Sequence, residues 1–487
     1  MFPPAFGRDL GASVVVFLVA LPLCVGVAVA SGLPAEAGLI TGIVGGLVVG
    51  MLPGSSLQVS GPAAGLTVLV FEAVKTYGVA ALAVIVVAAG LLQVLLGALR
   101  MGRWFRAVSV SVVEGMLAGV GLVIIAGQLY ALADRTAPTS GLGKITGLPG
   151  LVAGLFHSPQ ALAALALGAG TIAVMVLWRR VPRPLRAVPG PLVAVVLATG
   201  ASLLFAPDVK KVQVHGLLAS VHPVSPGDFG QLAQAGVLGT VLAFTLIASA
   251  ESLFSAAAVD RLHNGPRTDY DKELMAQGVG NTLCGVLGAL PMTAVIVRSS
   301  ANVHAGARTK ASRVLHGVWL LLFAALLPFV LAVIPVAALA GVLVHAGWKL
   351  LPLGRVRSMW REHRSETAVL IVTALAIVLA GMFEGVLIGL ALSVAKSAWE
   401  TSHLRIRRHD GGSGPIRVAL SGNATFLRLP VILDALEALP SDRPVELDLS
   451  GVRHIDHACT TALAAWTERH NRTEPQAHII PEPVGAA

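Results

Sequence analysis

The stretch QVSGPAAGLT (Gln58–Thr67) interrupts an apolar region with glycine, proline and hydroxyl-bearing residues, and LPMTAVIVRS (Leu290–Ser299) interrupts another in the second half. Each predicts a short extended segment followed by a helix that begins partway across a membrane. Irregular backbone at that depth is tolerated only against protein or a water-filled cavity. Paired broken helices indicate a binding site near the midplane, and their N-terminal N–H groups favour an anion. The alternative is that both stretches are kinks or close helix contacts.

The composition around these stretches is that of a polytopic membrane protein. Of the 487 residues, 55% are hydrophobic and 13% are charged, with a mean hydropathy of +0.79, whereas soluble domains carry about 25% charged residues. This excludes a secreted disulfide scaffold, a disordered protein and an ordinary cytosolic enzyme. Cys24, Cys284 and Cys459 lie far apart without partners at ligand spacing, which argues against a zinc site or a disulfide framework. The N-terminus shows no cleavable signal pattern.

Charge distribution predicts the topology. Apolar runs of about 20 residues, the length that crosses a bilayer, predict fourteen spans between residues 10 and 398. If the N-terminus is cytoplasmic, the loops after spans four, six, eight, ten and twelve hold most of the basic residues, as the positive-inside rule requires. These loops contain Arg100–Arg106, Arg179–Arg186, Arg261–Lys272, Arg308–Arg313 and Arg355–Arg364. We therefore expect both termini to be cytoplasmic, in a cell inner (plasma) membrane. The net charge of +9 does not indicate nucleic acid, because no basic patch is interleaved with aromatic residues.

A change in composition after Lys396 predicts a second domain. Residues 1–401 form the membrane domain, and 402–412 (SHLRIRRHDGG) are interpreted as a linker. Residues 413–473 combine strand-like alternation with helical apolar spacing, which predicts a small α/β domain. The last residues, 474–487, are interpreted as a tail.

One carboxylate inside a predicted span is a candidate functional group. Glu251 is the only charged residue between Gly236 and Val259, and an intramembrane carboxylate is costly unless it is paired, hydrated or protonated. Ser255 lies one turn further on the same helix face, so the two offer oxygen ligands to a cation, or Glu251 takes up a proton. In a third interpretation, Glu251 forms a purely structural ion pair with Arg298. Arg298 has a second possible role, in which it adds positive potential to the anion site. Three further acidic residues are expected at span ends in interfacial or packing roles: Glu36, Glu72 and Glu384.

Several motifs together resemble the SulP family of anion transporters (the sulfate permease and solute-carrier-26 superfamily) with a C-terminal STAS domain, over nearly the whole chain. The motifs are Leu21-Pro22, Ala30-Ser31-Gly32-Leu33-Pro34, Ser60-Gly61-Pro62, Ala250-Glu251-Ser252-Leu253, Gln277-Gly278-Val279-Gly280-Asn281 and the run from Arg298 to Thr309. The resemblance implies an all-α membrane fold of fourteen spans in two inverted repeats of seven. Spans 1–4 and 8–11 form a core, and spans 5–7 and 12–14 form a gate. An elevator-type movement and a homodimer are also implied.

The resemblance implies which residues of this chain form the substrate and ion sites. An anion lies between the two half-helices and span 1 in this family, and a span-8 carboxylate handles a coupling cation. The matching substrate positions are Ala64, Gly65, Thr67, Ala294, Val295 and Ile296, followed by Arg298; the ion positions are Glu251 and Ser255. The chain departs from sodium-coupled members, because it has Glu rather than Asp on span 8 and Ile296 where a hydroxyl can sit. Leu23 also replaces a glutamine that some members carry after Pro22, which argues against sulfate.

The C-terminal segment resembles a STAS domain through Val445–Ser450 and Ile455-Asp456-His457. Phosphorylatable relatives carry Ser or Thr after that aspartate, whereas His457-Ala458-Cys459 follow here, so we expect no serine switch. We interpret this domain as a docking or folding module.

Three functions compete on the sequence alone. The leading one is secondary active transport of a small inorganic anion, with bicarbonate favoured and a proton or sodium ion as coupling ion at Glu251 and Ser255. The second is transport or exchange of sulfate or a dicarboxylate such as fumarate by the same fold. The third is an uncoupled anion channel, which has no need of Glu251. A nucleobase transporter lacks these motifs, and an enzyme is disfavoured because the soluble part shows no catalytic, metal or nucleotide motif. No other cofactor is expected.

Overall fold

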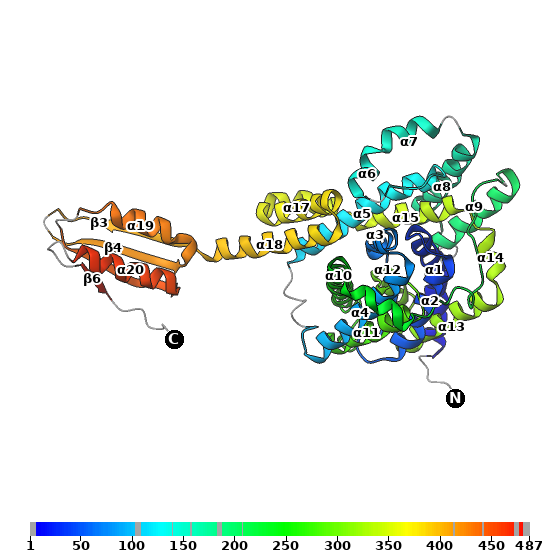
Figure 1. Ribbon diagram of the computed structural model, residues 1–487, viewed down its shortest axis with the longest axis horizontal. Helices are drawn as coiled ribbons and strands as arrows, with labels where there is room; N and C mark the ends of the chain where they lie inside the picture. The colour runs from blue at the N-terminus through cyan, green and yellow to red at the C-terminus, as the bar shows by residue number, and fades with distance from the viewer. Residues whose placement is uncertain are drawn as a thin grey trace. The chain divides into compact units, whose positions relative to one another are not determined.

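The computed structural model describes residues 6–102, 109–138, 140–155, 158–182, 188–206, 208–412, 414–440, 443–471 and 477–480. It divides into two compact units, one ending at Leu390 and one beginning at Ala391. The first unit is helical and the second contains a sheet (Figure 1).

The membrane unit contains two successive sets of elements, each with a short strand in front of a half-length helix. The first set is α1 (Phe6–Ala30), α2 (Ala35–Val44), β1 (Ser60–Pro62), α3 (Thr67–Tyr77), α4 (Val79–Ala98), α5 (Val110–Leu132), α6 (Gly141–Thr146), α7 (Leu148–Leu155), α8 (Pro159–Leu177) and α9 (Gly190–Phe205). The second is α10 (Ala235–Val259), α11 (Tyr270–Val286), β2 (Met292–Ala294), α12 (Ile296–His304), α13 (Ala311–Leu326), α14 (Pro328–Ala332), α15 (Val336–Leu350), α16 (Leu353–Glu362), α17 (Arg364–Ala380) and α18 (Met382–Thr401).

Helix packing joins elements far apart in the sequence. The long helix α4 packs along α11 and α10, and α1 packs against α13, whereas α5 packs against α15 and α17. In Figure 1, α1 and α12 lie side by side, and these two helices are also in contact. Because α1 also packs on α15, it connects the first group of helices to the second.

Within the described residues, seven helical stretches are long and apolar enough to cross a membrane; the number fourteen stays a prediction. Two apolar runs, each long enough by composition for one span, contain two helices each. Residues 151–178 are divided between α7 and α8, and residues 314–334 are divided between α13 and α14. In both places a proline, Pro159 or Pro328, begins the second helix, because proline fits the first helical turn but breaks a helix interior.

The second unit contains a four-stranded sheet in the order β3-β4-β5-β6, with helices α19 (Leu429–Glu437) and α20 (His457–His470). Strand β3 (Leu404–His409) is antiparallel to β4 (Ile416–Ala424), while β5 (Val445–Ile455) is parallel to both β4 and β6 (Ala477–Ile480).

Two sequence predictions about this unit are wrong. Residues 402–412 are not merely a linker, because β3 forms the sheet edge and packs Leu404 and Ile406 against the domain core. The predicted tail 474–487 contains strand β6, whose Ala477 is buried. The arginines at the outward positions of β3 give this segment the composition of a basic linker, so its sequence does not indicate a strand. Residues 481–487 lie outside the described part of the chain.

Candidate functional site

The two broken stretches of sequence meet as a two-stranded antiparallel sheet. Strand β1 pairs with β2 in the register Ser60 to Ala294, Gly61 to Thr293 and Pro62 to Met292. A short 3-10 turn at Ala64–Leu66 leads from β1 into α3, and Val295, in extended conformation, leads from β2 into α12. The first N–H groups of a helix have no acceptor within the helix. Both half-helices therefore present donors and a positive dipole end to the region where they begin.

Buried polar side chains fix this sheet to the surrounding helices. Asn281 on α11 accepts a hydrogen bond from the Met292 N–H at 2.7 Å and donates one to the Met292 carbonyl at 3.1 Å. The Asn281 amide also donates to Gln93 on α4 at 2.8 Å. Ser252 Oγ on α10 accepts from the Ala294 N–H at 3.2 Å, and Ser299 Oγ on α12 accepts from the Val59 N–H at 2.9 Å.

A cavity of about 240 Å³ lies where the half-helices begin. Its walls come from α1, α5, α10, α15 and the two half-helices. The lining residues are Leu23, Val27, Pro62, Ala64, Gly65, Val113, Met116, Leu117, Glu251, Phe254, Ser255, Val295, Ile296, Val297, Arg298, Ala346, Lys349 and Leu350. We call this space the cradle cavity. Its surface is mainly apolar side chains and half-helix backbone, with few charged groups.

Glu251 reaches the cradle cavity from α10. Its Oε2 is shielded from solvent and has no hydrogen-bond partner. Its carboxylate lies against the backbone of Gly65, because a Cβ built at Gly65 would be 2.7 Å from Oε1 and 2.8 Å from Oε2. Thr293 on β2 provides a side-chain hydrogen bond to it, and Ser255 lines the cavity one turn further along α10. A side chain at position 65 would therefore displace the Glu251 carboxylate from its present position.

Arg298 enters the same cavity from α12 and is completely buried. Its Nη2 donates to the Pro62 carbonyl at 3.2 Å, while Nε and Nη1 have no partner. The guanidinium lies against Gly61, where any side chain would overlap Nη1. Among the ion pairs of the described residues, none joins Arg298 to Glu251. The structure therefore contradicts the reading of Glu251 as half of a structural pair with Arg298.

Seven of the nine predicted site residues line the cradle cavity: Ala64, Gly65, Glu251, Ser255, Val295, Ile296 and Arg298. The other two do not. Thr67 lines a smaller neighbouring cavity, and Ala294 is fully buried within β2. Sequence reasoning missed Phe254, Met116 and the positioning residue Asn281. Asn281 ends the family motif Gln277–Asn281, which could have indicated it. That motif does not show which backbone groups Asn281 binds.

The acidic residues expected at span ends lie outside the cradle cavity. Glu36 is buried and accepts hydrogen bonds from the N–H groups of His215 and Gly216, at 2.5 Å and 2.9 Å. This is a packing role, which ties the loop before α10 to the start of α2. Glu72 and Glu384 line another cavity, between α3, α10 and α18.

The profile of the sulfate permease family matches residues 6–373, which is most of the chain. The protein belongs to the sulfate permease family. A second profile, described as Mlab, STAS domain, matches residues 409–475, so the C-terminal unit is a STAS domain in agreement with its sequence motifs.

Relatives of this sulfate permease family member are named as anion transporters. It is 28% identical to the putative sulfate transporter YvdB of Bacillus subtilis, over 80% of this chain and 73% of that protein. It is 26% identical to the bicarbonate transporter BicA of Synechocystis, over 93% of this chain and 84% of that one. The fold matches the inward-facing structure of the murine anion transporter Slc26a9 with a TM-score of 0.81, at 17% identity and over 98% and 86% of the two chains.

Family membership and these relatives support anion transport across a membrane and point away from enzymatic activity. The helical membrane unit with paired half-helices and the small α/β domain agree with the fold class predicted from the sequence.

Proposed function

We propose that the protein is a secondary active transporter of a small monovalent anion, bicarbonate, by an elevator-type movement coupled to a cation through Glu251. The observation that carries this proposal is the cradle cavity, in which a carboxylate with one unpartnered oxygen and a partly unpartnered guanidinium share one space without an ion pair. A buried charge without a partner is costly. An anion beside Arg298 and a proton or sodium ion on Glu251 remove both costs together, which couples their binding.

The wall of the cradle cavity favours a monovalent anion over sulfate. Apart from Glu251, Arg298, Ser255 and Lys349, its side chains are apolar. The cost of removing an ion from water rises with the square of its charge, so a dianion needs many more donors than an apolar wall supplies. Arg298 and Lys349, set against Glu251, leave the lining with one net positive charge, which together with the half-helix N–H groups balances one negative charge.

The direction of opening agrees with an inward-facing state. The cradle cavity is lined by the beginning of α5 and the end of α15. Under the positive-inside prediction, both ends adjoin cytoplasmic loops, since Arg100 precedes α5 and Arg355 follows α15. The same charge distribution supports cytoplasmic termini in a cell inner membrane, and the family resemblance supports a homodimer.

Uptake into proteoliposomes tests the proposal. Labelled bicarbonate, sulfate and fumarate are each offered with an imposed proton gradient, sodium gradient or no gradient. We expect bicarbonate to accumulate above its external concentration only with one of the cation gradients. Accumulation of sulfate or fumarate instead identifies a different substrate, and uptake of bicarbonate that follows only its own gradient identifies an uncoupled pathway.

A further inference from the structure

A second cavity, of about 410 Å³, lies at the other ends of the helices that line the cradle cavity. The cradle cavity contacts the beginning of α5 and the end of α15, whereas the second contacts the end of α5 and the beginning of α15. It is also lined by the last turns of α1 and α3. The two cavities therefore lie toward opposite faces of the membrane unit, and the topology prediction makes the second one external.

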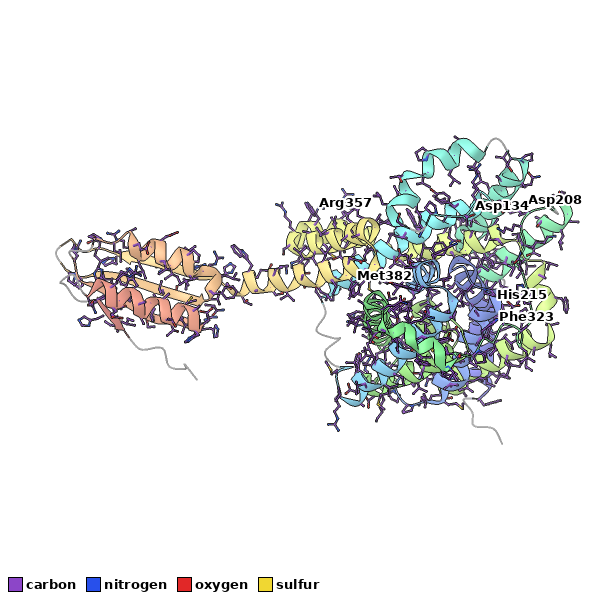
Figure 2. All side chains as sticks on the ribbon, in the orientation of Figure 1. Asp134, Asp208, His215, Phe323, Arg357 and Met382 are labelled. Atoms are coloured by element: carbon purple, nitrogen blue, oxygen red, sulfur yellow. The ribbon has the colours of Figure 1, made fainter. Side chains whose placement is uncertain are left out.

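Basic side chains dominate the second cavity, which we call the basic cavity. Lys75 at the end of α3, Arg135 after α5 and Lys210 before α10 line it, and all three are exposed. The one carboxylate of its lining is Asp134, which follows α5 in the chain and is labelled in Figure 2. An excess of positive charge in a recess concentrates small anions.

A small cavity of about 40 Å³ adjoins the basic cavity and reaches the start of α3. It shares five lining residues with the basic cavity, and it also contains Thr67 and Lys144; the shared residues are Ala30, Phe71, Gly127, Gln128 and Ala137. Lys144 on α6 is 4% exposed, and its Nζ lies 5.5 Å from the centre of the Phe71 ring. Thr67 Oγ1, in the first turn of α3, is buried without a hydrogen-bond partner.

These groups form a series from the outer face toward the half-helices. Exposed cations come first, then a buried ammonium over an aromatic ring, and then an unpartnered hydroxyl at the start of α3. The carboxylate that interacts with Lys144 is Glu72, also on α3, and it offsets part of the charge. With Asp134 and Glu72 counted against Lys75, Arg135, Lys144 and Lys210, the region remains positive.

We propose that the basic cavity is a second binding site for the transported anion, on the face opposite the cradle cavity, with Lys144 as its innermost cation. The inference rests on the proposed anion transport and adds the external step. Anions gather at Lys75, Arg135 and Lys210, and Lys144 holds an anion next to Thr67 when the half-helices face outward.

Thiol labelling tests this site without measuring transport. Thr136 lines the basic cavity, and all three native cysteines are buried, so Thr136→Cys is a clean reporter in the full-length protein. Membrane-impermeant thiosulfonate reagents of opposite charge are applied from outside. We expect the anionic reagent to react about tenfold faster than the cationic one at low salt. Millimolar bicarbonate or sulfate is expected to slow the reaction.

Removing positive charges from the basic cavity identifies the residues that cause the difference in labelling rate between the anionic and cationic reagents. Lys75→Gln with Lys210→Gln is expected to bring the two labelling rates within about twofold of each other and to remove protection by the anion. Lys211→Gln is the matched control, since Lys211 is adjacent in sequence but does not line the cavity. Equal labelling rates in the parent reporter protein, or a ratio that the double substitution leaves unchanged, overturn the inference.

A transport measurement separates this inference from the proposed function. Lys144→Gln is expected to raise the KM for external anion about tenfold and to leave the KM for internal anion within about twofold. Unchanged external KM in this variant overturns the inference while the proposed function stands. If the unmodified protein transports no anion, the proposed function itself is overturned. Should Lys144→Gln not fold, the labelling experiment still decides the question.

Discussion

Glu251 and Arg298 carry opposite charges into one cavity, yet each leaves buried atoms without a partner. Buried polar atoms without a partner cost free energy. In a purely structural ion pair, the Glu251 carboxylate and the Arg298 guanidinium would be in contact. Their separation instead leaves room for ligands that bind to one or both. The residue scale is therefore where coupling is best tested.

Glu251→Gln keeps the size and hydrogen-bonding capacity of the side chain but removes its charge. The protein is expected to fold, because the cost of an intramembrane charge is removed. Concentrative uptake is expected to disappear. In a proton-coupled transporter, exchange of anion for anion survives, since glutamine imitates the protonated state; in a sodium-coupled one, transport becomes slow at every pH. Uptake against a gradient and counterflow are compared in proteoliposomes across pH and sodium concentration. Full accumulation by this variant would contradict coupling through Glu251.

Gly65→Ala places a methyl group where the Glu251 carboxylate lies, 2.7 Å from its Oε1. The carboxylate has to move, so the transport rate is expected to fall about tenfold or more, which corresponds to about 1.4 kcal/mol in the barrier. Gly239→Ala is the matched control, since Gly239 lies on α10 with open space around its Cβ position. Initial uptake rates of the two variants, normalised to protein amount, make the comparison. Equal rates would show that Glu251 tolerates displacement.

Asp448 gives the STAS domain a pH dependence. Hydrogen bonds from the Ser450 hydroxyl and N–H, and from Arg417, lower the pKa of the Asp448 carboxyl from 3.8 to about 2. Because its pKa is lower in the folded state, ionised Asp448 stabilises the fold above about pH 4, and this contribution is lost as the pH falls toward 2. Asp448→Asn is expected to flatten the acid end of the stability curve, measured by denaturant unfolding of residues 403–487. If the free energy of unfolding depends on pH equally in both proteins, other acidic residues cause the acid sensitivity.

At the scale of elements, β1 and β2 decide where the half-helices begin. Their pairing joins residues more than two hundred positions apart in the chain, from Ser60 to Ala294. The pair has two strands of three residues each, too little for stability by itself. Buried side chains of the neighbouring helices therefore have to hold it in place.

Asn281→Ala removes both side-chain hydrogen bonds to Met292. The Met292 N–H and carbonyl then stay buried without these partners, at a cost of about 1–3 kcal/mol. We expect a lower melting temperature in detergent together with weaker anion binding, because β2 leads directly into α12. Asn302→Ala is a useful comparison, since Asn302 is equally buried but donates to Leu57. Loss of stability without any change in anion affinity would limit Asn281 to a folding role.

At the scale of the whole molecule, the two units have separate cores. The STAS core is built from residues 416–477, and the cradle cavity from residues 23–350. Every residue that lines the cradle cavity therefore belongs to the membrane unit.

Deletion of residues 403–487 is expected to leave anion binding intact, because the cradle cavity lies entirely in the remaining part. The cut precedes β3, so no unpaired strand is left behind. Anion binding to the purified truncated protein is measured by calorimetry beside the full-length protein. A folded truncated protein that no longer binds anion would show that the cavity depends on the STAS domain.

The sequence by itself determined the membrane class, the family resemblance, the paired half-helices and the choice of Glu251 and Arg298 as residues of the candidate site. These properties follow from local composition and from motifs, and an isolated charge in an apolar run is visible without coordinates. The helix starts at Pro159 and Pro328 also follow from a local rule, because proline favours the first turn of a helix.

Only the tertiary structure decided which groups touch. It shows no ion pair between Glu251 and Arg298, places the Glu251 carboxylate against Gly65 and Thr67 in a neighbouring cavity, and joins the Asn281 side chain to β2 by hydrogen bonds. Strands β3 and β6 also became visible only through their partners in the sheet. The physical reason is common to all of these. Side-chain contacts and strand pairing join residues distant in sequence, and the hydrophobic pattern of each segment is compatible with several such arrangements.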